Sequence, residues 1–316
     1  MLRRELAAVA RALSLVEDTR APVEAEARAL LAELHAVARS KGHRVGVTGP
    51  PGAGKSSLLS RMVSGYRRRG RSVGVLAIDP SSPRSGGALL GDRARMVLDV
   101  DDPDVFVRSM ASGGSLGGLS RAAGAAVDVL GAAYDVVIVE TTGVGQSETD
   151  IEHVTDTVLL VIQPASGDIL QFIKSGIVEI PDRFVVNKSD LGAVATRAAS
   201  ELKSALRVAD KGHDPDGVLL ASATEDTGID ALLDSLDAHR RMLEQDGKLL
   251  PRRDAKAAQW GLRLLEYRSW QAELARLGGR AEVVASLEQA TSAGQDALSA
   301  VHALAHDSRK EEGTGR

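Results

Sequence analysis

Short apolar runs alternate with stretches of helical periodicity along the middle of the chain. Runs rich in Val, Ile and Leu predict seven strands, at residues 45–48, 72–79, 105–109, 135–140, 157–163, 183–187 and 218–222. Some runs, such as residues 136–139, are apolar throughout, which is typical of strands buried on both faces of a parallel sheet. Apolar residues three and four apart predict helices between the strands. We therefore expect an α/β fold with a doubly wound, mostly parallel sheet.

Helical patterns also precede and follow the predicted sheet. Two amphipathic helices come before the first strand, and Pro22 opens the second of them. After the last strand, a helix around Leu232 leads into a charged linker over residues 240–254. A long helical stripe then contains both tryptophans, Trp260 and Trp270. Aromatic anchors on such a helix predict a subunit interface, and packing on the chain's own sheet is the alternative.

These patterns divide the chain into four parts. We expect an N-terminal helical segment at 1–42, an α/β domain at 43–245, a C-terminal helical dimerisation segment at 246–306 and a disordered tail at 307–316. The N-terminal helices are expected to pack on the α/β domain, without chemistry of their own.

Composition narrows the class of protein. Lys and Arg total 39 against 43 Asp and Glu, a net charge of −4, so we expect no nucleic-acid partner. The absence of Cys excludes disulfides and thiolate metal sites, and it suits a reducing compartment. Charged residues interrupt the N-terminus early, and no apolar run approaches about 18 residues. We therefore expect a cytoplasmic protein with neither a signal peptide nor a membrane span.

Residues 49–56 carry the G-x-x-x-x-G-K-[ST] pattern of a phosphate-binding loop, between a β-branched run and a helical pattern. Its glycines let backbone N–H groups face phosphate oxygens, and the helix N-terminus adds its positive end. Lys55 is expected to reach the β- and γ-phosphates, and Ser56 to ligate Mg²⁺. The predicted nucleotide-binding residues here are Gly49, Pro50, Pro51, Gly52, Ala53, Gly54, Lys55, Ser56 and Ser57.

Acidic residues follow two of the predicted strands, at the sheet edge where α/β proteins bind ligands. Asp79 ends the second strand and is the first candidate for a further Mg²⁺ ligand, and Asp92 is the second candidate. Each is alternatively a helix-cap or turn residue. Glu140 ends the fourth strand, where it either orders a water on Mg²⁺ or positions the attacking water. Gly143 is placed to bring a backbone N–H to the γ-phosphate.

The N-K-x-D pattern after the sixth strand, Asn187, Lys188 and Asp190, predicts recognition of guanine. The Asp190 carboxylate can accept two hydrogen bonds from guanine, and adenine offers neither donor on that edge. Sites built on such buried bonds discriminate by roughly four to five decades. Ser222 and Ala223, after the seventh strand, are expected to present a backbone N–H to the guanine carbonyl. The sequence therefore favours GTP or GDP with Mg²⁺ over ATP.

The sequence resembles the MeaB/ArgK-type GTPases, the G-protein chaperones of adenosylcobalamin-dependent acyl-CoA mutases. The resemblance covers about residues 20–290. Besides the phosphate loop, it rests on residues 79–83, 91–93, 107–110, 140–148, 167–174 and 187–190. It implies a homodimer joined through C-terminal helices, with slow GTP hydrolysis until the protein docks on a mutase. It also implies gated delivery of intact adenosylcobalamin and removal of the damaged cofactor.

The resemblance also implies roles for individual residues. Asp168, Gln171 and Lys174 resemble a third switch region, so Gln171 and Lys174 join Lys55 and Glu140 as catalytic candidates. Residues 112–115 depart from the family pattern near a loop expected to face the partner, as do Phe172 and Pro181 elsewhere. Methylmalonyl-, isobutyryl-, 2-hydroxyisobutyryl- and ethylmalonyl-CoA mutases therefore all stay open as partners.

Other functions share this nucleotide-binding pattern. A nickel-insertion GTPase typically needs a metal store of Cys or clustered His, and this chain has no Cys. A partitioning ATPase has an extra lysine early in the loop, where this chain has Pro50 and Pro51, and Asp190 favours guanine. A kinase acting on transport proteins is disfavoured because no phospho-acceptor site is recognisable. A GTP-binding scaffold with little catalysis remains an alternative.

Overall fold

The computed structural model describes residues 4–18, 20–79, 102–112, 119–120, 122–141, 147–164, 180–209 and 217–292. The chain divides into two compact units, Met1–Trp260 and Gly261–Arg316, and the division falls within helix α9 (Leu249–Arg276). The first unit holds the sheet, and in the second unit α10 (Arg280–Ser292) follows the end of α9. No helix within the described ranges is long and apolar enough to cross a membrane.

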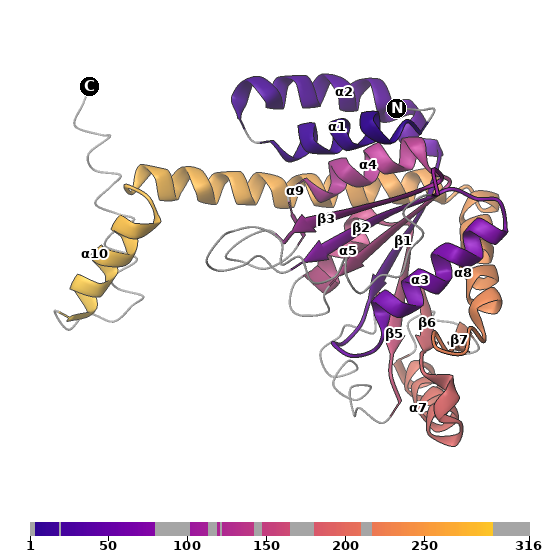
Figure 1. Ribbon diagram of the computed structural model, residues 1–316. Coiled ribbons are helices and arrows are strands. Elements are labelled where there is room, and N and C mark those ends of the chain that lie inside the picture. The colour runs from indigo at the N-terminus through magenta and orange to yellow at the C-terminus, as the bar shows by residue number, and fades with distance from the viewer. Residues whose placement is uncertain are drawn as a thin grey trace, which may run out of the picture. The chain divides into compact units, whose positions relative to one another are not determined.

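All seven predicted strands are confirmed, and they pair in parallel in the order β3-β2-β4-β1-β5-β6-β7 (Figure 1). The strands are β1 (His43–Thr48), β2 (Val73–Asp79), β3 (Val105–Ala111), β4 (Val136–Thr141), β5 (Thr157–Ile162), β6 (Arg183–Val186) and β7 (Val218–Leu220). Every position of β1, β2, β4 and β5 is buried, as their apolar runs predict. Because β1 lies in the middle and the chain winds outward on both sides, the sheet is doubly wound.

Helices cover both faces of this sheet. On one face, α3 (Lys55–Arg68) and α8 (Ile229–Gln245) share an apolar core with the strands. α7 (Ala193–Ala209) packs on β5 and β6 in a separate cluster. α4 (Ala123–Ala133) and α5 (Ser147–Val154) lie against strand glycines: a Cβ on Gly46 would be 2.8 Å from the Ile151 side chain of α5. Glycine is therefore needed there for the helix to approach the sheet closely.

The two N-terminal helices pack on the α/β domain, as expected. α1 (Leu6–Glu17) and α2 (Ala21–Ser40) both contact α4 (Figure 1). α1 buries Val9 and Leu13, and Glu17 near its end accepts hydrogen bonds from Arg108 of β3 at 2.7 and 2.9 Å. These contacts attach the helices to the edge of the sheet.

The prediction of a charged linker at residues 240–254 is wrong, because most of this segment is helical. α8 continues to Gln245, and α9 begins at Leu249. Gly247, with φ +67°, makes the turn between them, and Pro251 lies in the first turn of α9, where its missing N–H removes no helical hydrogen bond. The polar residues therefore belong to two helices and not to a flexible connection.

Trp260 packs within its own unit, which is the alternative left open for it. The side chain is 8% exposed, and a Cβ on Gly124 of α4 would lie only 2.5 Å from its indole nitrogen. Gly124 thus provides the space that the indole ring fills. The side chain of Trp270 lies outside the described residues.

A buried ionic cluster joins the helices to the start of β5. Asp156, whose side chain is 0% exposed, accepts hydrogen bonds from Arg253 at 2.6 and 2.7 Å and from Arg240 at 2.9 Å. Arg253 also donates, at 2.6–3.2 Å, to carbonyl oxygens around the end of α2, those of Ala38, Arg39, Lys41 and Gly42. Two arginines of the expected linker therefore connect α8, α9 and α2 with the sheet.

Candidate nucleotide site

The phosphate-binding loop connects β1 to α3, and two of its glycines are required by its backbone. Gly49 has φ +144°, and a Cβ there would lie 2.1 Å from the carbonyl oxygen of Val161 on β5. Gly54, with φ +84°, is the N-cap of α3, and a Cβ there would lie 2.5 Å from Asn187 Nδ2. The loop can therefore turn this tightly only with glycine at both positions. It ends at the helix N-terminus, where first-turn N–H groups lack intrahelical partners and suit an anion.

The Lys55 side chain folds back over this loop. Its ammonium donates to the carbonyl oxygens of Gly49 at 2.7 Å and Pro50 at 3.1 Å, and the residue is 7% exposed. A cation held against the loop that turns into α3 is placed to meet a phosphate bound by the loop. The contact of Lys55 with phosphate stays a prediction.

Two residues after β6 hold two further carbonyls of the loop. Asn187 Nδ2 donates to the carbonyl of Ala53 at 2.9 Å, and Lys188 Nζ donates to that of Gly52 at 2.8 Å. The C=O and N–H groups of a peptide unit point in opposite directions. Anchoring these carbonyls toward β6 therefore turns the N–H groups of the same peptide units the other way. Pro51, Ser56 and Ser57 complete the predicted loop set.

Three of the residues predicted to surround Mg²⁺, directly or through water, come from adjacent elements. Ser56 Oγ, in the first turn of α3, donates to Glu140 Oε1 at 2.8 Å. Asp79 ends β2, the neighbour of β4, and is 1% exposed, while Glu140 is 3% exposed. Hydroxyl and carboxylate oxygens are the ligands that Mg²⁺ prefers, and substrate phosphates and waters usually complete its shell. The donors present therefore fit Mg²⁺, and within the described ranges no group of three or more His, Cys, Asp or Glu forms a separate metal site.

The predicted guanine-binding residues meet where β6 and β7 end. Asp190 Oδ1 accepts a hydrogen bond from Ser222 Oγ at 2.5 Å, and the backbone N–H of Ala223 donates to Asn187 Oδ1 at 3.2 Å. Asn187 thus contacts the phosphate loop with its amide nitrogen, and with its amide oxygen it contacts Ala223, in the loop after β7. The structure therefore joins the predicted base site and the predicted phosphate site through one side chain.

The sequence analysis missed two residues that contact members of the predicted nucleotide site. Arg61 on α3 donates to the carbonyl of Ala223 at 2.8 Å, and Gln163, directly after β5, accepts from Lys188 Nζ at 2.7 Å. The position of Gln163 at the end of an apolar strand is the one signal that sequence offered. Five predicted or implied residues lie outside the described ranges, namely Asp92, Gly143, Asp168, Gln171 and Lys174.

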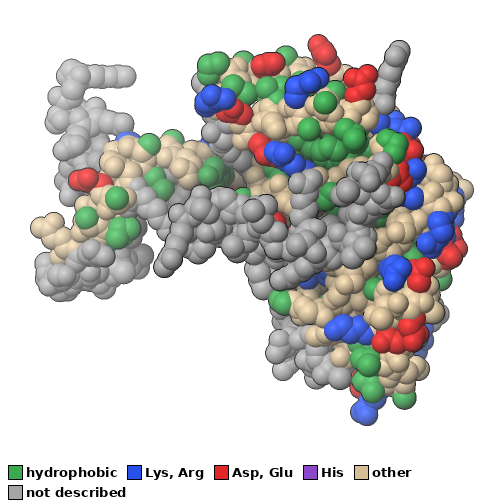
Figure 2. All heavy atoms as spheres, viewed as in Figure 1, with side chains coloured by type: hydrophobic (Ala, Val, Ile, Leu, Met, Phe, Trp, Pro, Cys, Tyr) green, Lys and Arg blue, Asp and Glu red, His purple; other side chains and the backbone are tan. Residues whose placement is uncertain are grey.

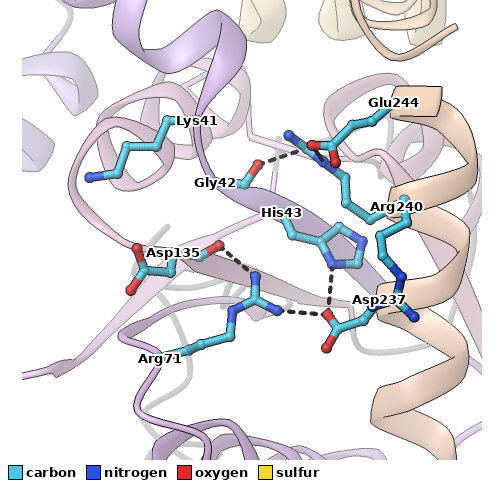
Figure 3. Close-up of a pocket in the computed structure, with 9 residues that line it drawn as sticks. Lys41, Gly42, His43, Arg71, Asp135, Asp237, Arg240 and Glu244 are labelled. Atoms are coloured by element: carbon cyan, nitrogen blue, oxygen red, sulfur yellow. Dashed lines mark hydrogen bonds and ion pairs between the residues drawn. The ribbon is translucent and has the colours of Figure 1, made fainter. Parts of the chain in front are cut away.

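A pocket of about 480 Å³ lies at the amino-terminal ends of the parallel strands, beside the beginnings of β1, β2 and β4 (Figure 3). Its described lining includes none of the predicted nucleotide-binding residues. Figure 3 shows Asp237 of α8 between His43 and Arg71, and Arg71 donates to it at 2.7 Å. Burial lowers the pKa of His43 despite this carboxylate. Arg71 and Arg240 of this lining are already paired with carboxylates, those of Asp237, Asp156 and Glu244, so the pocket is a weaker candidate for phosphate than the glycine-rich loop.

We expect Asp190→Asn to lower GDP affinity by roughly 10²-fold or more, because the amide oxygen can accept only one of the two guanine hydrogen bonds and the amide nitrogen sets a donor against the other guanine donor. The variant should instead favour xanthosine diphosphate, whose additional carbonyl can accept from the new amide. Calorimetry with both nucleotides measures the exchange. Asp234→Asn, at a side chain 70% exposed on α8, is the matched control. Unchanged GDP affinity in Asp190→Asn would remove the guanine assignment.

Comparisons with known proteins agree with this geometry. Residues 9–276 match the family described as methylmalonyl-CoA mutase-associated GTPase MeaB. GTPase ArgK of Escherichia coli is 38% identical over 264 residues, 81% of this chain and 78% of that protein. The mitochondrial methylmalonic aciduria type A homolog of Mus musculus is 34% identical over 280 residues, 84% of this chain and 68% of that protein.

A solved structure shows the same fold. The crystal structure of an LAO/AO transport system kinase superposes with a TM-score of 0.70 at 29% sequence identity, and the match covers 96% of this chain and 93% of that one. The family match extends from α1 to the end of α9 and includes the phosphate loop, Glu140 and the N-K-x-D residues. This chain therefore belongs to the MeaB family of P-loop GTPases.

Proposed function

We propose that this GTPase is a chaperone of an adenosylcobalamin-dependent acyl-CoA mutase. It gates loading of the cofactor and protects or reactivates the mutase. The observation that carries the proposal is the family match over residues 9–276, because that family is described by its association with methylmalonyl-CoA mutase. The similarity to the methylmalonic aciduria type A homolog supports the same assignment.

Each residue of the site has a separate role in the proposed GTP hydrolysis. Asp190 selects guanine. Asn187 donates to the Ala53 carbonyl of the phosphate loop at 2.9 Å and so holds the base site and the phosphate loop in a fixed relative position. Lys55 stabilises charge on the β- and γ-phosphates, and Ser56 and Asp79 would hold Mg²⁺, which would neutralise phosphate charge there. Glu140, 2.8 Å from Ser56, orders a water either on the metal or for attack.

The proposed assembly is a homodimer formed through the C-terminal helices. Leu262 and Leu265 of α9 and Val284 of α10, all in the second unit, are 50%, 61% and 44% exposed. Figure 2 shows hydrophobic side chains at the surface of these helices, and such exposed aliphatic side chains support the proposed contact with a second subunit. Trp260 takes no part in this surface, because it is buried in the first unit.

Comparing GTP turnover with and without an acyl-CoA mutase tests the proposal. Wild type should be accelerated by the cognate mutase. Lys174→Ala should lose most of that acceleration, because the implied switch lysine supplies positive charge to the transition state. In other GTPases an arginine in this role contributes roughly 10³- to 10⁵-fold. Lys248→Ala, at a side chain 68% exposed, is the control.

The outcomes of this experiment separate the chaperone assignment, the switch assignment and the scaffold alternative. If no acyl-CoA mutase encoded beside this protein accelerates wild type, the chaperone assignment fails. If Lys174→Ala is stimulated as strongly as wild type, only the switch assignment fails. A wild type with neither basal nor stimulated turnover would support the GTP-binding scaffold.

A nickel-insertion GTPase is the alternative within the same architecture. The chain has no Cys, and the described residues contain no cluster that could store a metal. His302 and His306 stand four residues apart in the sequence, outside the described ranges. Nickel binding by the purified protein, lost in a double His302→Ala, His306→Ala variant, would favour this alternative.

A further inference from the structure

Gln163 lies between two parts of the nucleotide site without belonging to either motif. It follows β5, which ends at Ile162, and its amide oxygen accepts a hydrogen bond from Lys188 Nζ at 2.7 Å. Both polar atoms of its amide would be 3.9 Å from a Cβ built on Gly52 of the phosphate loop. The Gln163 side chain therefore packs beside the loop while it binds the lysine of the N-K-x-D motif.

The Lys188 side chain spans the two halves of the site. Its backbone, with φ +60° and ψ +43°, is in the left-handed region that non-glycine residues adopt rarely. From there the ammonium reaches the carbonyl oxygen of Gly52 at 2.8 Å. Asp190, two residues further on, belongs to the base site. Lys188 thus runs from the predicted base site to the phosphate loop.

The chemistry of an ammonium determines how Gln163 must face it. Lysine carries three donors and no acceptor, so only the amide oxygen of Gln163 can bind it. Gly52 and Gln163 together accept two of the three donors. Without Gln163, Lys188 would keep the loop carbonyl but lose the contact that fixes its ammonium from the β5 side.

We propose that Gln163 is a positioning residue for guanine nucleotide, which holds Lys188 across the phosphate loop and thereby slows nucleotide release. Gln163 acts through Lys188 and needs no contact with the nucleotide itself. The inference depends on GTP binding by the loop, and it is independent of any mutase partner.

Nucleotide release measures this role directly. Stopped-flow displacement of a fluorescent GDP analogue should show release accelerated roughly five- to tenfold in Gln163→Leu, which keeps the volume but removes the acceptor. Gln163→Glu, which restores an acceptor and adds charge, should release GDP at the wild-type rate or more slowly. Gln259→Leu, at an exposed glutamine on α9, is the control and should behave as wild type.

A double-mutant cycle separates positioning from a general packing effect. Lys188→Met should itself accelerate release, and adding Gln163→Leu to it should have little further effect, because the two residues act through one contact. Gln163→Met replaces the leucine variant if that protein does not fold.

Three results would overturn the inference. They are unchanged release in the apolar variant, equal acceleration by Gln163→Glu, and an undiminished effect of Gln163→Leu in the Lys188→Met background.

Discussion

Lys55→Ala is expected to lower GTP turnover by at least roughly 10²- to 10³-fold, because it removes a fixed positive charge from the reacting phosphates. The structure holds the Lys55 ammonium on the carbonyls of Gly49 and Pro50, at 2.7 and 3.1 Å, so its position depends on the loop itself. Release of phosphate at saturating GTP measures the effect.

The same lysine also contributes to binding of the ground state. GTP affinity should therefore be determined separately, by calorimetry, so that saturation is assured. Lys256→Ala is not a suitable control, because Lys256 is largely buried and donates to the Thr155 carbonyl at 2.8 Å. Lys248→Ala, on the surface, is the better comparison. A loss of turnover smaller than about tenfold in Lys55→Ala would contradict the role assigned to it.

Asp156→Ala is expected to lower the free energy of unfolding by about 3–5 kcal/mol, because it leaves buried arginines without their counter-charge. Arg253 is 8% exposed and shares the carboxylate with Arg240. Urea denaturation followed by circular dichroism measures the change. Asp254→Asn, which removes an exposed pair with Arg39, should leave the free energy of unfolding almost unchanged and is the matched control. Equal stability of the two variants would contradict the structural role of Asp156.

This cluster also predicts the direction of a pH effect. Burial opposes ionisation of Asp156, but hydrogen bonds and charges from Arg253, together with the charge of Arg44, outweigh it and keep its pKa below the ordinary value. A carboxylate with a depressed folded pKa contributes stability that is present above its unfolded pKa, about 3.9. That contribution should therefore be complete at neutral pH and be lost as the pH falls below about 4.

The strands and much of the site were predictable because their signals are local. Fully apolar runs mark buried parallel strands, and parallel topology brings strand ends such as Asp79 and Glu140 to one edge. The N-K-x-D and phosphate-loop patterns each lie within a few residues of sequence. Their function can therefore be inferred from the sequence without knowledge of the residues that pack around them in the fold.

The residues that sequence analysis misjudged depend on distant partners. Arg240 and Arg253 look like surface residues of a linker, because nothing near them in sequence shows that Asp156 will be buried against them. Trp260 looks like an interface anchor until Gly124 is seen to make room for it. Gln163 gains its proposed role only through Lys188, which lies in the loop after the neighbouring strand β6. In each case the deciding group lies far away in the sequence, on another element of the fold or in a loop beside it.

The parallel direction of the strands has an electrostatic consequence. Asp156 directly precedes β5, and Gln163 directly follows its six residues, so the ionic cluster and the phosphate loop lie roughly 20 Å apart along the strand. Unit charges at that distance interact by less than about 1 kcal/mol at an effective dielectric constant of 20. Substitutions in the ionic cluster should therefore change how firmly the helices are attached while leaving the electrostatic potential at the phosphates almost unaltered. The two ends of the strands can therefore be engineered independently, the amino-terminal end for the free energy of unfolding and the carboxyl-terminal end for nucleotide binding and hydrolysis.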